Sequence, residues 1–502
     1  DPGSPGSEDY WWYGSSWVSV GAGNQEKWFP ETNMWTIAGS SRGFYTFVIS
    51  SESWVSGKTY RIRYRSYDYL DNIETSKVRS FTVDNLPPVS RVVYPLNNNS
   101  YINPTVISGT AVDDSPTSSG VDRTEIEIRD VSVEKGVQGS NLGYWDGSNW
   151  VTGSSWVVTT PLTSGATRWQ YTSLPNPWPS DRWYRITSRA RDIAGNKEEN
   201  GYTLSYIEFS VDNQAPQAAI TLPVNNDGHS PTKPLNTISG TAYDAFTALD
   251  GLVVKIGMQD LSTGKYWTSA MDWTGDNFWA DVIMDSTTVS GKLEWRYSKS
   301  FNWQSGRRYN IIAIGRDKAG NEKIYGISSF TVGVDSNVFT YDSSAPQMSF
   351  TKPLEGAATP VYSLLPTISG NVADKPDAPL FNSGVKEVEI RISYLLSGDT
   401  YYWQGGAGPV YWSSETVTSF YDTTGVSTWT YTHSKFADNS AWTDGRLYYV
   451  DARAKDNANN LSSWKRQTFI YDSVAPLTPA VNLPLNLRAY DSLAQITGTA
   501  ED

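Results

Sequence analysis

An internal repeat of about 130 residues constrains this chain more than any other feature. The segment Asp-Ile-Ala-Gly-Asn at 192–196 returns at 317–321 and 456–460, with a weaker version at 68–72. A second landmark begins with Phe and closes with Asp, and its closing residues are Asp84, Asp212, Asp342 and Asp472. They are spaced by 128 (212−84), 130 (342−212) and 130 (472−342) residues. Such self-similarity predicts one structural module copied along the chain.

The landmarks define three complete modules at residues 85–212, 213–342 and 343–472. Residues 1–84 match only the later part of a module, and residues 473–502 match only its opening strands. Because so short an opening cannot bury a core of its own, we expect a segment of a longer repetitive protein. The alternative is that incomplete ends of neighbouring copies complete each other in an assembly.

The junctions between modules are short and end in proline, as in Val-Asp-Asn-Leu-Pro-Pro at 83–88 and Asp-Ser-Val-Ala-Pro at 472–476. None of them contains a Gly/Ser tract. A linker of a few residues with a fixed proline φ has little freedom to swing. The sequence therefore predicts an elongated array of modules joined end to end.

Composition excludes several classes of function. The chain has 22 Trp, 31 Tyr, no Cys and a formal charge of −13. Without cysteine it has no disulfide framework and no thiolate site. An acidic chain lacks the basic surface that nucleic acids require, and no apolar run reaches the length of a membrane span.

Residues 85–212 show the strand pattern of one module. From Val121 to Asp130, Thr124, Ile126 and Ile128 alternate with charged residues, as in a half-buried antiparallel strand. Further strands are predicted around residues 89–94, 105–112, 169–171, 184–191 and 205–211. Six or seven short strands without helical spacing predict an all-β fold, an immunoglobulin-like β-sandwich.

A Trp–Tyr pair recurs at a fixed distance from the repeated turn. Each tyrosine lies eight residues before the turn aspartate and six residues after a tryptophan; the pairs are Trp54 with Tyr60, Trp178 with Tyr184, Trp303 with Tyr309, and Trp442 with Tyr448. This placement predicts a tyrosine corner, in which the hydroxyl bonds back to the chain. The tryptophan is predicted to be its buried partner, and burying such a ring contributes roughly 2–3 kcal/mol.

These residues resemble bacterial immunoglobulin-like repeat domains of large surface and secreted proteins. The resemblance rests on Ile-Ser-Gly-Thr-Ala-x-Asp at 107–113, Ser-Gly-Val at 119–121 and Ala-Arg-Asp-x-Ala-Gly-Asn at 190–196. The second module departs from it with Asp-Gly-Leu at 250–252. The family implies an extracellular or cell-surface location, and its members serve as spacers, adhesins or enzyme appendages.

Catalytic and cofactor motifs are missing from the sequence. The two histidines, His229 and His433, lie in different modules, and there is no zinc, P-loop or dinucleotide fingerprint. Carboxylate pairs, as used by glycosidases, exist only as scattered turn and strand residues. We therefore predict a protein that is not an enzyme, with neither catalytic nor cofactor-binding residues.

Aspartates at two recurring turns are candidate metal ligands. One set follows the Ile-Ser-Gly-Thr strand and the other opens the repeated turn; together they are Asp113, Asp114, Asp192, Asp244, Asp317, Asp374 and Asp456. If both turns lie at one end of a sandwich, their oxygens would suit calcium. The alternative is a purely local role, because aspartate readily bonds its own backbone in turns.

Each module also carries an aromatic hairpin. The tentative contacts for a partner or glycan are Tyr144, Trp145, Trp150, Tyr266, Trp267, Trp273, Tyr402, Trp403 and Trp412, with a related run at residues 10–17. Exposed rings would stack on sugars or dock a partner chain. Buried rings would instead enlarge the module's own core.

The sequence thus predicts an extracellular structural repeat segment of a bacterial surface stalk, filament or adhesin. Self-association into a fibre or surface layer is expected, since module edges repeat along the chain. A glycan or cell-surface ligand is a further candidate partner. The alternatives are a carbohydrate-binding array that uses the aromatic hairpins, and the non-catalytic part of a large secreted hydrolase.

Overall fold

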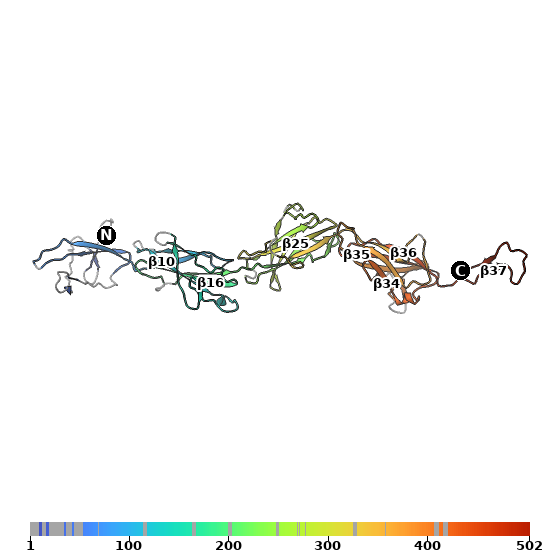
Figure 1. The fold of residues 1–502 in the computed structure, drawn as a ribbon, viewed down its shortest axis with the longest axis horizontal. Helices are drawn as coiled ribbons and strands as arrows, with labels where there is room; N and C mark the ends of the chain where they lie inside the picture. Colours follow the sequence, from blue (N-terminus) through green and yellow to red (C-terminus); the bar gives the residue numbers. More distant parts are fainter. Residues whose placement is uncertain are drawn as a thin grey trace. The chain divides into compact units, whose positions relative to one another are not determined.

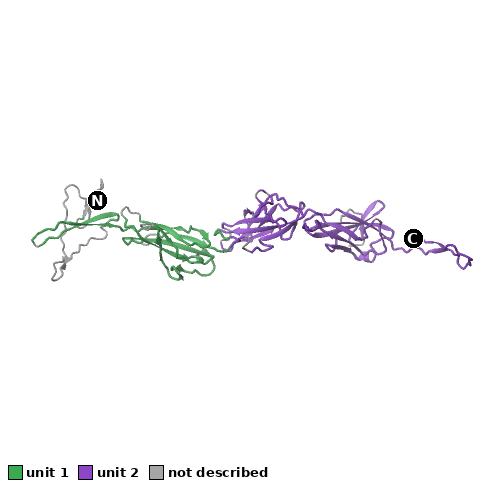
Figure 2. Cartoon of the chain, turned by 45° about the horizontal axis from the view of Figure 1, so that its top comes forward, with its two compact units in different colours: residues 1–214, 318–321 green, residues 215–317, 322–502 purple. Residues whose placement is uncertain are grey.

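The computed structural model describes four short segments, 10–12, 17–19, 35–36 and 43–44, and most of residues 54–502. The gaps in that last range are 69, 114–117, 163–166, 199–202, 247–249, 269, 271, 277, 325–328, 357, 406–410 and 415–419. The chain divides into two compact units, one of residues 1–214 with 318–321 and the other of 215–317 with 322–502 (Figure 2).

The first unit contains the first complete module, built from two sheets (Figure 1). The smaller sheet has the order β14 (Thr160–Pro161), β15 (Arg168–Tyr171), β9 (Ile107–Val112) and β7 (Val89–Tyr94). The larger has the order β12 (Trp150–Val151), β11 (Tyr144–Trp145), β10 (Val121–Asp130), β16 (Arg182–Asp192), β17 (Tyr206–Val211) and β8 (Asn99–Tyr101), while β13 (Val157–Val158) pairs with β10. A 3-10 turn (Val133–Lys135) follows β10.

Alternation along each strand explains why these two sheets face each other. On β10 the side chains of Thr124, Ile126 and Ile128 are buried. Ile126 and Ile128 join residues of the smaller sheet, such as Ile107 and Trp169, in one core. Period-two burial on both sheets gives a β-sandwich with charged residues on the outer faces.

The second unit contains the strands of the second complete module, within residues 215–317 and 322–342. One sheet has the order β18 (Gln217–Leu222), β20 (Thr237–Tyr243), β24 (Lys292–Ser298) and β23 (Ile283–Val289). The other has the order β19 (Gly228–His229), β26 (Ser336–Tyr341), β25 (Arg307–Arg316), β21 (Val253–Asp260) and β22 (Trp279–Asp281). Their inner faces share a core around Ile238, Ile256 and Trp295.

The third complete module lies in the same unit. Its smaller sheet has the order β27 (Gln347–Lys352), β29 (Thr367–Ala373) and β34 (Thr428–Thr432). The larger has the order β28 (Val361–Tyr362), β36 (Lys465–Tyr471), β35 (Arg446–Asp456), β30 (Val385–Leu396), β31 (Asp399–Trp403) and β32 (Trp412–Ser413), while β33 (Tyr421–Asp422) pairs with β30. One helical turn, α1 (Ser434–Ala437), adds Phe436 to the core.

The incomplete modules contribute two-stranded pairs. In the first unit β1 (Tyr10–Trp12) pairs with β2 (Trp17–Ser19), β3 (Trp35–Thr36) with β4 (Gly43–Phe44), and β5 (Lys58–Tyr64) with β6 (Lys77–Val83). In the second unit β37 (Ala480–Leu483) pairs with β38 (Thr497–Thr499). Among the described residues no helix is long and apolar enough to cross a membrane.

The glycine of the Ile-Ser-Gly-Thr motif has a steric cause. A Cβ on Gly109 would lie 2.2 Å from the ring of Trp169, which packs across the strand from β15. The same contact recurs at 2.3 Å between Gly240 and Trp295 and at 2.5 Å between Gly370 and Trp429. The motif therefore marks the place where a buried indole covers the strand, and any side chain there would displace it.

The predicted tyrosine corners are present in four places. The hydroxyls of Tyr60, Tyr309 and Tyr448 accept the backbone N–H five residues upstream, at 2.8–2.9 Å. Tyr184 instead donates to the carbonyl of Pro179 at 2.8 Å, because proline has no N–H. The partner tryptophan packs edge-on against each ring at centroid distances of 4.7–4.9 Å.

The fold prediction is confirmed: the described modules are tandem immunoglobulin-like β-sandwiches. In the first complete module the predicted strands at 89–94, 121–130 and 184–191 coincide closely with β7, β10 and β16.

Candidate functional site

The repeated Asp-x-Ala-Gly-Asn turn is closed by its own aspartate. Asp192 Oδ1 accepts the backbone N–H groups of Gly195 and Asn196 at 2.6 and 2.7 Å. Its Oδ2 accepts Asn196 Nδ2 at 2.6 Å. Asp456 holds Asn460 in the same way at 2.7 Å through both oxygens. The local role expected for an aspartate in a turn is therefore fulfilled.

The asparagine that ends the turn has a second bond, which connects one module to the preceding one. Asn196 Nδ2 donates to the carbonyl of Asp84 at 3.0 Å, and Asn460 Nδ2 donates to that of Asp342 at 2.7 Å. Within the first unit, Asn321 Nδ2 donates to the carbonyl of Asp212 at 2.9 Å. We call this bond the junction latch.

The closing aspartate is also held through its side chain. Asp84 Oδ2 accepts the N–H of Ser119 at 2.7 Å, and Asp342 Oδ2 accepts the N–H of Ser383 at 2.8 Å. Both serines belong to the following module. Sequence reasoning identified the turn aspartate and missed this role of the asparagine, although the Asn recurs at the same spacing as the Asp in every copy.

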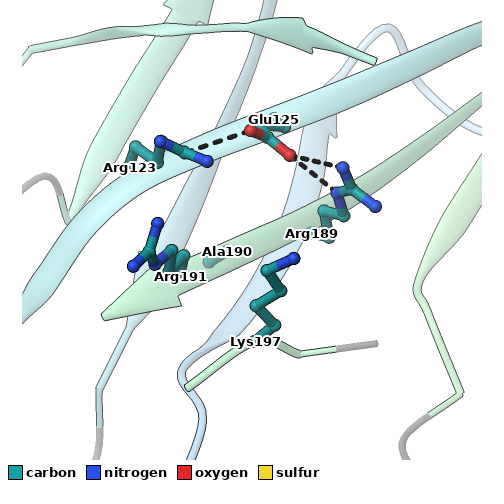
Figure 3. A pocket seen from close by; sticks show the side chains of 6 residues that line it. All are labelled: Arg123, Glu125, Arg189, Ala190, Arg191 and Lys197. Atoms are coloured by element: carbon teal, nitrogen blue, oxygen red, sulfur yellow. Dashed lines mark hydrogen bonds and ion pairs between the residues drawn. The ribbon is translucent and has the colours of Figure 1, made fainter. Parts of the chain in front are cut away.

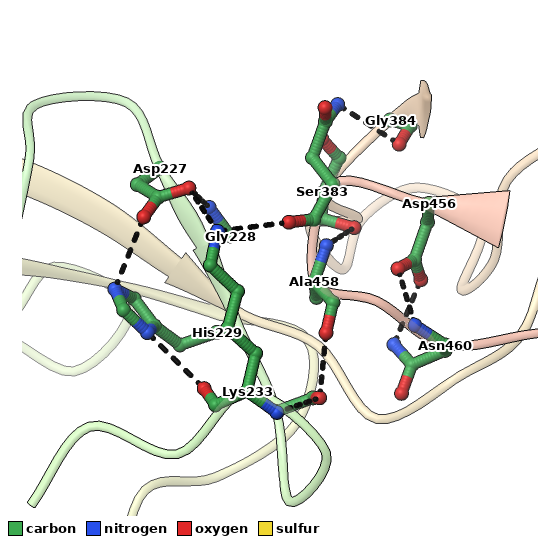
Figure 4. A network of polar contacts seen from close by, with 11 residues as sticks. Asp227, Gly228, His229, Lys233, Ser383, Gly384, Asp456, Ala458 and Asn460 are labelled. Carbon is green, nitrogen blue, oxygen red and sulfur yellow. Dashed lines mark hydrogen bonds and ion pairs between the residues drawn. The ribbon is translucent and has the colours of Figure 1, made fainter. Parts of the chain in front are cut away.

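A second set of contacts joins the two complete modules of the second unit (Figure 4). Ser230 Oγ, fully buried, donates to the carbonyl of Ala458 at 2.7 Å. Lys233 Nζ donates to the carbonyl of Asn457 at 3.2 Å. Gly228 fits so closely that a Cβ would lie 2.7 Å from the Cβ of Ser383. The turn of the third module is therefore seated on a loop of the second.

The two histidines have structural surroundings. His229 is buried beside this contact; its Nδ1 lies 3.2 Å from the carbonyl of Lys233 and its Nε2 lies 3.5 Å from Asp227 Oδ2 (Figure 4). Burial lowers the pKa of His229, although the carboxylate of Asp227 opposes this. His433 Nδ1 accepts the N–H of Lys435 at 3.2 Å and caps α1.

The two sets of candidate metal ligands meet at the junctions. In the first unit, carboxylate oxygens of Asp84, Asp113 and Asp192 lie within 4.8 Å of one another. In the second unit the same holds for Asp342, Asp374 and Asp456, all of them buried. In each set the closing aspartate joins two of the residues predicted from sequence.

For the other predicted metal ligands the structure shows less. Asp244 and Asp317 are both buried in the second unit, and Asp244 Oδ1 accepts the N–H of Phe246 at 2.8 Å. Asp114 lies outside the described residues.

Charge at the two clusters is not balanced by nearby cations. Among the described residues, no Lys, Arg or His forms an ion pair with Asp84, Asp113, Asp192, Asp342, Asp374 or Asp456. Burial, with repulsion from Asp342 and Asp456, raises the pKa of Asp374 to about 6. Burial followed by repulsion from neighbouring carboxylates also raises the pKa of Asp113 and of Asp456. Buried oxygens without a counter-charge fit a hard divalent cation.

The aromatic hairpins pack on the modules that carry them. Trp145, Trp267 and Trp403 are 7%, 0% and 1% exposed, and Tyr266 is 4% exposed. Such rings offer no free face to a sugar. Tyr144 and Tyr402 are half-buried under the guanidinium groups of Arg129 and Arg391.

The second hairpin tryptophan explains why the hairpin recurs. Its ring packs on the corner tyrosine with centroid distances of 5.4 Å (Trp150–Tyr184), 4.7 Å (Trp273–Tyr309) and 5.4 Å (Trp412–Tyr448). The hairpin thus completes the core around the tyrosine corner. Of the two roles considered from the sequence, this is the structural one, in which the rings enlarge the module's own core.

No protein-family model matches the sequence, and no curated protein matches it either. Among solved structures, a 1.5-MDa bacterial ice-binding adhesin is 13% identical, with 78% of this chain and 99% of that chain covered and a TM-score of 0.29. The FN1–FN3 domains of chicken CNTN1 are 10% identical, with 77% and 99% covered and a TM-score of 0.24.

The fibronectin(III)-like modules of Clostridium thermocellum CbhA are 12% identical, with 51% of this chain and 94% of that chain covered and a TM-score of 0.22. At such scores these likenesses carry no argument about function. The fold rests on strand pairing, on the paired sheets and on the four tyrosine corners. By these features the chain consists of tandem immunoglobulin-like repeats.

Proposed function

We propose that the chain is an extracellular structural repeat segment of a bacterial surface stalk, filament or adhesin. The observation that carries this proposal is the junction latch, because it joins successive modules through hydrogen bonds that are partly buried at Asn196 and buried at Asn460. Asn196 and Asn460 each hold the last residue of the preceding module. A chain built to transmit position or force between its ends requires such joints.

One junction combines three such restraints. At the junction between the second and third modules these are the latch to Asp342, the Ser383 N–H bond to the same residue, and the Ser230–Ala458 bond. Hydrogen bonds of this kind each contribute roughly 1 kcal/mol, and together they limit bending. Short linkers that end in proline act in the same direction.

Calcium at the junctions is part of the proposal. The clusters around Asp192 and Asp456 supply three carboxylates each, and the residues come from both sides of a junction. A bound divalent cation would replace the missing counter-charge and connect the two modules. Because the ligands are oxygens only, the chemistry favours calcium over zinc or copper.

Small-angle scattering of the full chain, with calcium and with chelator, tests this function. Strands of eight to ten residues give roughly 30 Å per module, so an extended chain would measure on the order of 150 Å. We expect a long, narrow distance distribution in calcium that becomes broader and shorter in chelator. A compact particle in both conditions would contradict a stalk.

Self-association into a fibre or surface layer remains part of the proposal. The contacts would not involve the buried rings of the aromatic hairpins, which the sequence had suggested. Since Trp145, Trp267 and Trp403 are buried, they cannot form such contacts in folded modules. Sheet edges and outer faces remain as contact surfaces. Sedimentation of the full chain over a wide concentration range tests this, and a strict monomer at every concentration would contradict it.

A further inference from the structure

Two loops at the junction between the second and third modules are longer than their counterparts in the first module. In the second module, six positions separate His229 from Leu235 (235−229). The separation is three in both other complete modules; the pairs are Tyr101 with Pro104 and Tyr362 with Leu365 (104−101 and 365−362). The second module therefore carries three additional residues in this loop.

Strand register and a shared hydrogen bond show that these positions correspond. His229, Tyr101 and Tyr362 each pair in parallel with the last strand of their module; the partners are Tyr341, Val211 and Tyr471. At the other end of the loop, the corner tryptophan donates its Nε1 to the carbonyl of Leu235 at 2.9 Å and of Pro104 at 2.8 Å. The additional residues therefore lie between two positions that the fold holds in place.

A loop of the third module at the same junction is also three residues longer. Asp374 and Gly384, which precedes β30, are ten positions apart (384−374). The separation is seven in the other two modules; the pairs are Asp113 with Gly120 and Asp244 with Gly251 (120−113 and 251−244). All three glycines have a positive φ, of 82°, 84° and 68°, which marks the same turn position in each module.

The longer loop of the second module holds the repeated turn of the third (Figure 4). Three of its side chains donate to three consecutive carbonyls of that turn: Ser230 Oγ to Ala458 at 2.7 Å, Thr232 Oγ1 to Asn459 at 3.3 Å and Lys233 Nζ to Asn457 at 3.2 Å. Asp227 pairs with the ammonium group of Lys233 at 2.6 Å and so fixes its position. The inserted residues of this loop thus supply donors to the next module.

The longer loop of the third module reaches a turn of the second. The N–H of Phe381 donates to the carbonyl of Gly306 at 3.0 Å. A Cβ on Gly306 would lie 3.1 Å from the Cβ of Leu380. The guanidinium carbon of Arg308 lies 5.6 Å from the centroid of the Phe381 ring. This loop therefore packs closely on the turn that precedes β25.

The two loops cross the junction in opposite directions. One extends from the second module to residues 456–460 of the third, and the other extends from the third module to Gly306 of the second. Rotation of one module about the linker would break one of these contacts unless its axis passed through both. Relative motion of linked modules is the default expectation, and this pair of contacts opposes it.

From the two insertions and their reciprocal contacts, we infer that the second and third modules form a rigid pair, whose angle is fixed by the two longer loops. The inference rests on the proposed function and names the part of the array that does not bend. Surface loops accept insertions at little cost, and the first module folds with neither insertion. The insertions therefore serve the junction, and bending of the array is expected outside this pair.

Distances between two spin labels test the rigid pair, and a chain without cysteine suits this measurement. Ser262→Cys in the second module and Ser427→Cys in the third place labels at exposed positions on the two modules. Ser427→Cys with Ser397→Cys, both in the third module, gives the width of a distribution without motion between modules. Pulsed electron spin resonance of the full chain in calcium chloride should give similar widths for the two pairs.

Shortening both loops to the length in the first module should release the pair. Residues 230–234 are replaced with Ile-Asn, as at 102–103, and residues 375–382 with Asp-Ser-Pro-Thr-Ser, as at 114–118. This change keeps Ser383, whose N–H binds Asp342. We expect the distribution between the modules to become about twofold wider or more, since independent modules move relative to each other. The distribution within the third module should stay the same.

Alanine variants supply a milder test with a matched control. Leu380→Ala with Phe381→Ala removes two side chains, 52% and 40% exposed, that meet the second module. Leu395→Ala with Leu396→Ala removes two side chains of similar exposure, 56% and 43%, from the β30–β31 hairpin. Only the first pair of substitutions should broaden the distribution between the modules. If the shortened chain melts at a lower temperature than its parent, these variants decide the question.

Two results would overturn the rigid pair. One is a distribution between the modules of the parent chain that is already much broader than the one within the third module. The other is an unchanged width in the loop variants when their melting curves match that of the parent. Failure of the proposed function would look different, because a compact particle in solution scattering contradicts a stalk whatever the width between these two modules.

Discussion

The first and third complete modules share an interior and differ on their outer faces. Both place a tryptophan edge-on against a corner tyrosine, cover that tyrosine with a hairpin indole, and end their turn in a latch asparagine. On the outer sheet face the first module places Arg123 opposite Arg191 and Glu125 opposite Arg189 (Figure 3). The third has compensated pairs and the stacked rings of Phe420 and Trp464.

This difference separates what the fold requires from what it permits. Buried positions must fill one shape, so a change in one ring affects all its neighbours. Outer positions of a strand face water and can change charge at little cost to stability. Function specific to one module is therefore expected on the outer face, and function common to all modules at the corners and junctions.

The largest expected effect tests the shared interior. Trp178→Ala and Trp442→Ala each remove a buried ring, and we expect each to destabilise its own module by about 3–5 kcal/mol. Thermal melting of the full chain should show one transition lowered and the others unchanged. The control is Trp464→Ala, since that ring is 41% exposed. Unchanged melting curves for both core variants would disprove the shared role of this tryptophan.

Replacing the same two tryptophans by phenylalanine is a milder test of the difference between the first and third modules. Trp178 Nε1 donates to the carbonyl of Pro104 at 2.8 Å, whereas Trp442 Nε1 has no partner among the described residues. Trp178→Phe should therefore cost more than Trp442→Phe.

The next effect concerns calcium, and it should differ between the junctions. Asp342, Asp374 and Asp456 are all buried, while Asp84 and Asp113 are only half-buried. A free calcium concentration one hundred times the dissociation constant of a site would stabilise the folded state by about 2.7 kcal/mol. We expect chelation to lower the melting temperature, most strongly for the transition that Asp374→Asn also shifts. Identical curves with calcium and chelator would leave the aspartates with their turn role alone.

Without calcium, the stability of the third module should depend on pH through the carboxyl group of Asp374. Burial and neighbouring carboxylates raise its pKa in the folded chain to about 6, above its ordinary value of 3.8. A raised carboxyl pKa contributes stability that is present below pH 4 and is lost as the pH rises through 6. In chelator we therefore expect the third module to melt at a lower temperature at pH 7 than at pH 5. Calcium should reduce or reverse this difference, since it binds the deprotonated carboxylates.

A smaller effect tests the junction latch. Asn460 is buried, and Asn460→Ala leaves the carbonyl of Asp342 without its donor. We expect a loss of about 1–3 kcal/mol, and a smaller loss for the half-buried Asn196→Ala. Solution scattering should also show a broader distance distribution for Asn460→Ala. If melting and scattering are unaffected by both substitutions, the latch does not stiffen the junction.

Sequence reasoning recovered the features that depend on spacing along the chain. The strand alternation around Ile126, the corner at Tyr184 and the buried partner Trp178 all follow from local periodicity and fixed intervals. The proximity of Asp113 to Asp192 was a condition of the calcium hypothesis, which the sequence left open beside a purely local role in the turns. These features are repeated, so each copy supported the others.

The features that sequence reasoning missed depend on tertiary contact. The second bond of Asn196 crosses to another module, and no interval along one module reveals it. Packing of Trp150 on Tyr184 requires the hairpin to fold back over the corner. The juxtaposition of Arg123 and Arg191 depends on the register of β10 and β16, since the two residues are 68 positions apart (191−123).

The smallest expected effect is a difference between the first and third modules in the hydrogen bond that the tyrosine-corner hydroxyl makes. Tyr448→Phe removes the acceptor of the Thr443 N–H, while Tyr184→Phe removes the donor to the Pro179 carbonyl. Both bonds are partly buried, and an N–H without an acceptor is tolerated less well than a carbonyl, which has two lone pairs. We expect Tyr448→Phe to cost about 1 kcal/mol and Tyr184→Phe to cost less. Denaturant unfolding of the full chain measures both. A larger loss for Tyr184→Phe would mean that the rings, rather than the direction of the hydrogen bond, distinguish the two corners.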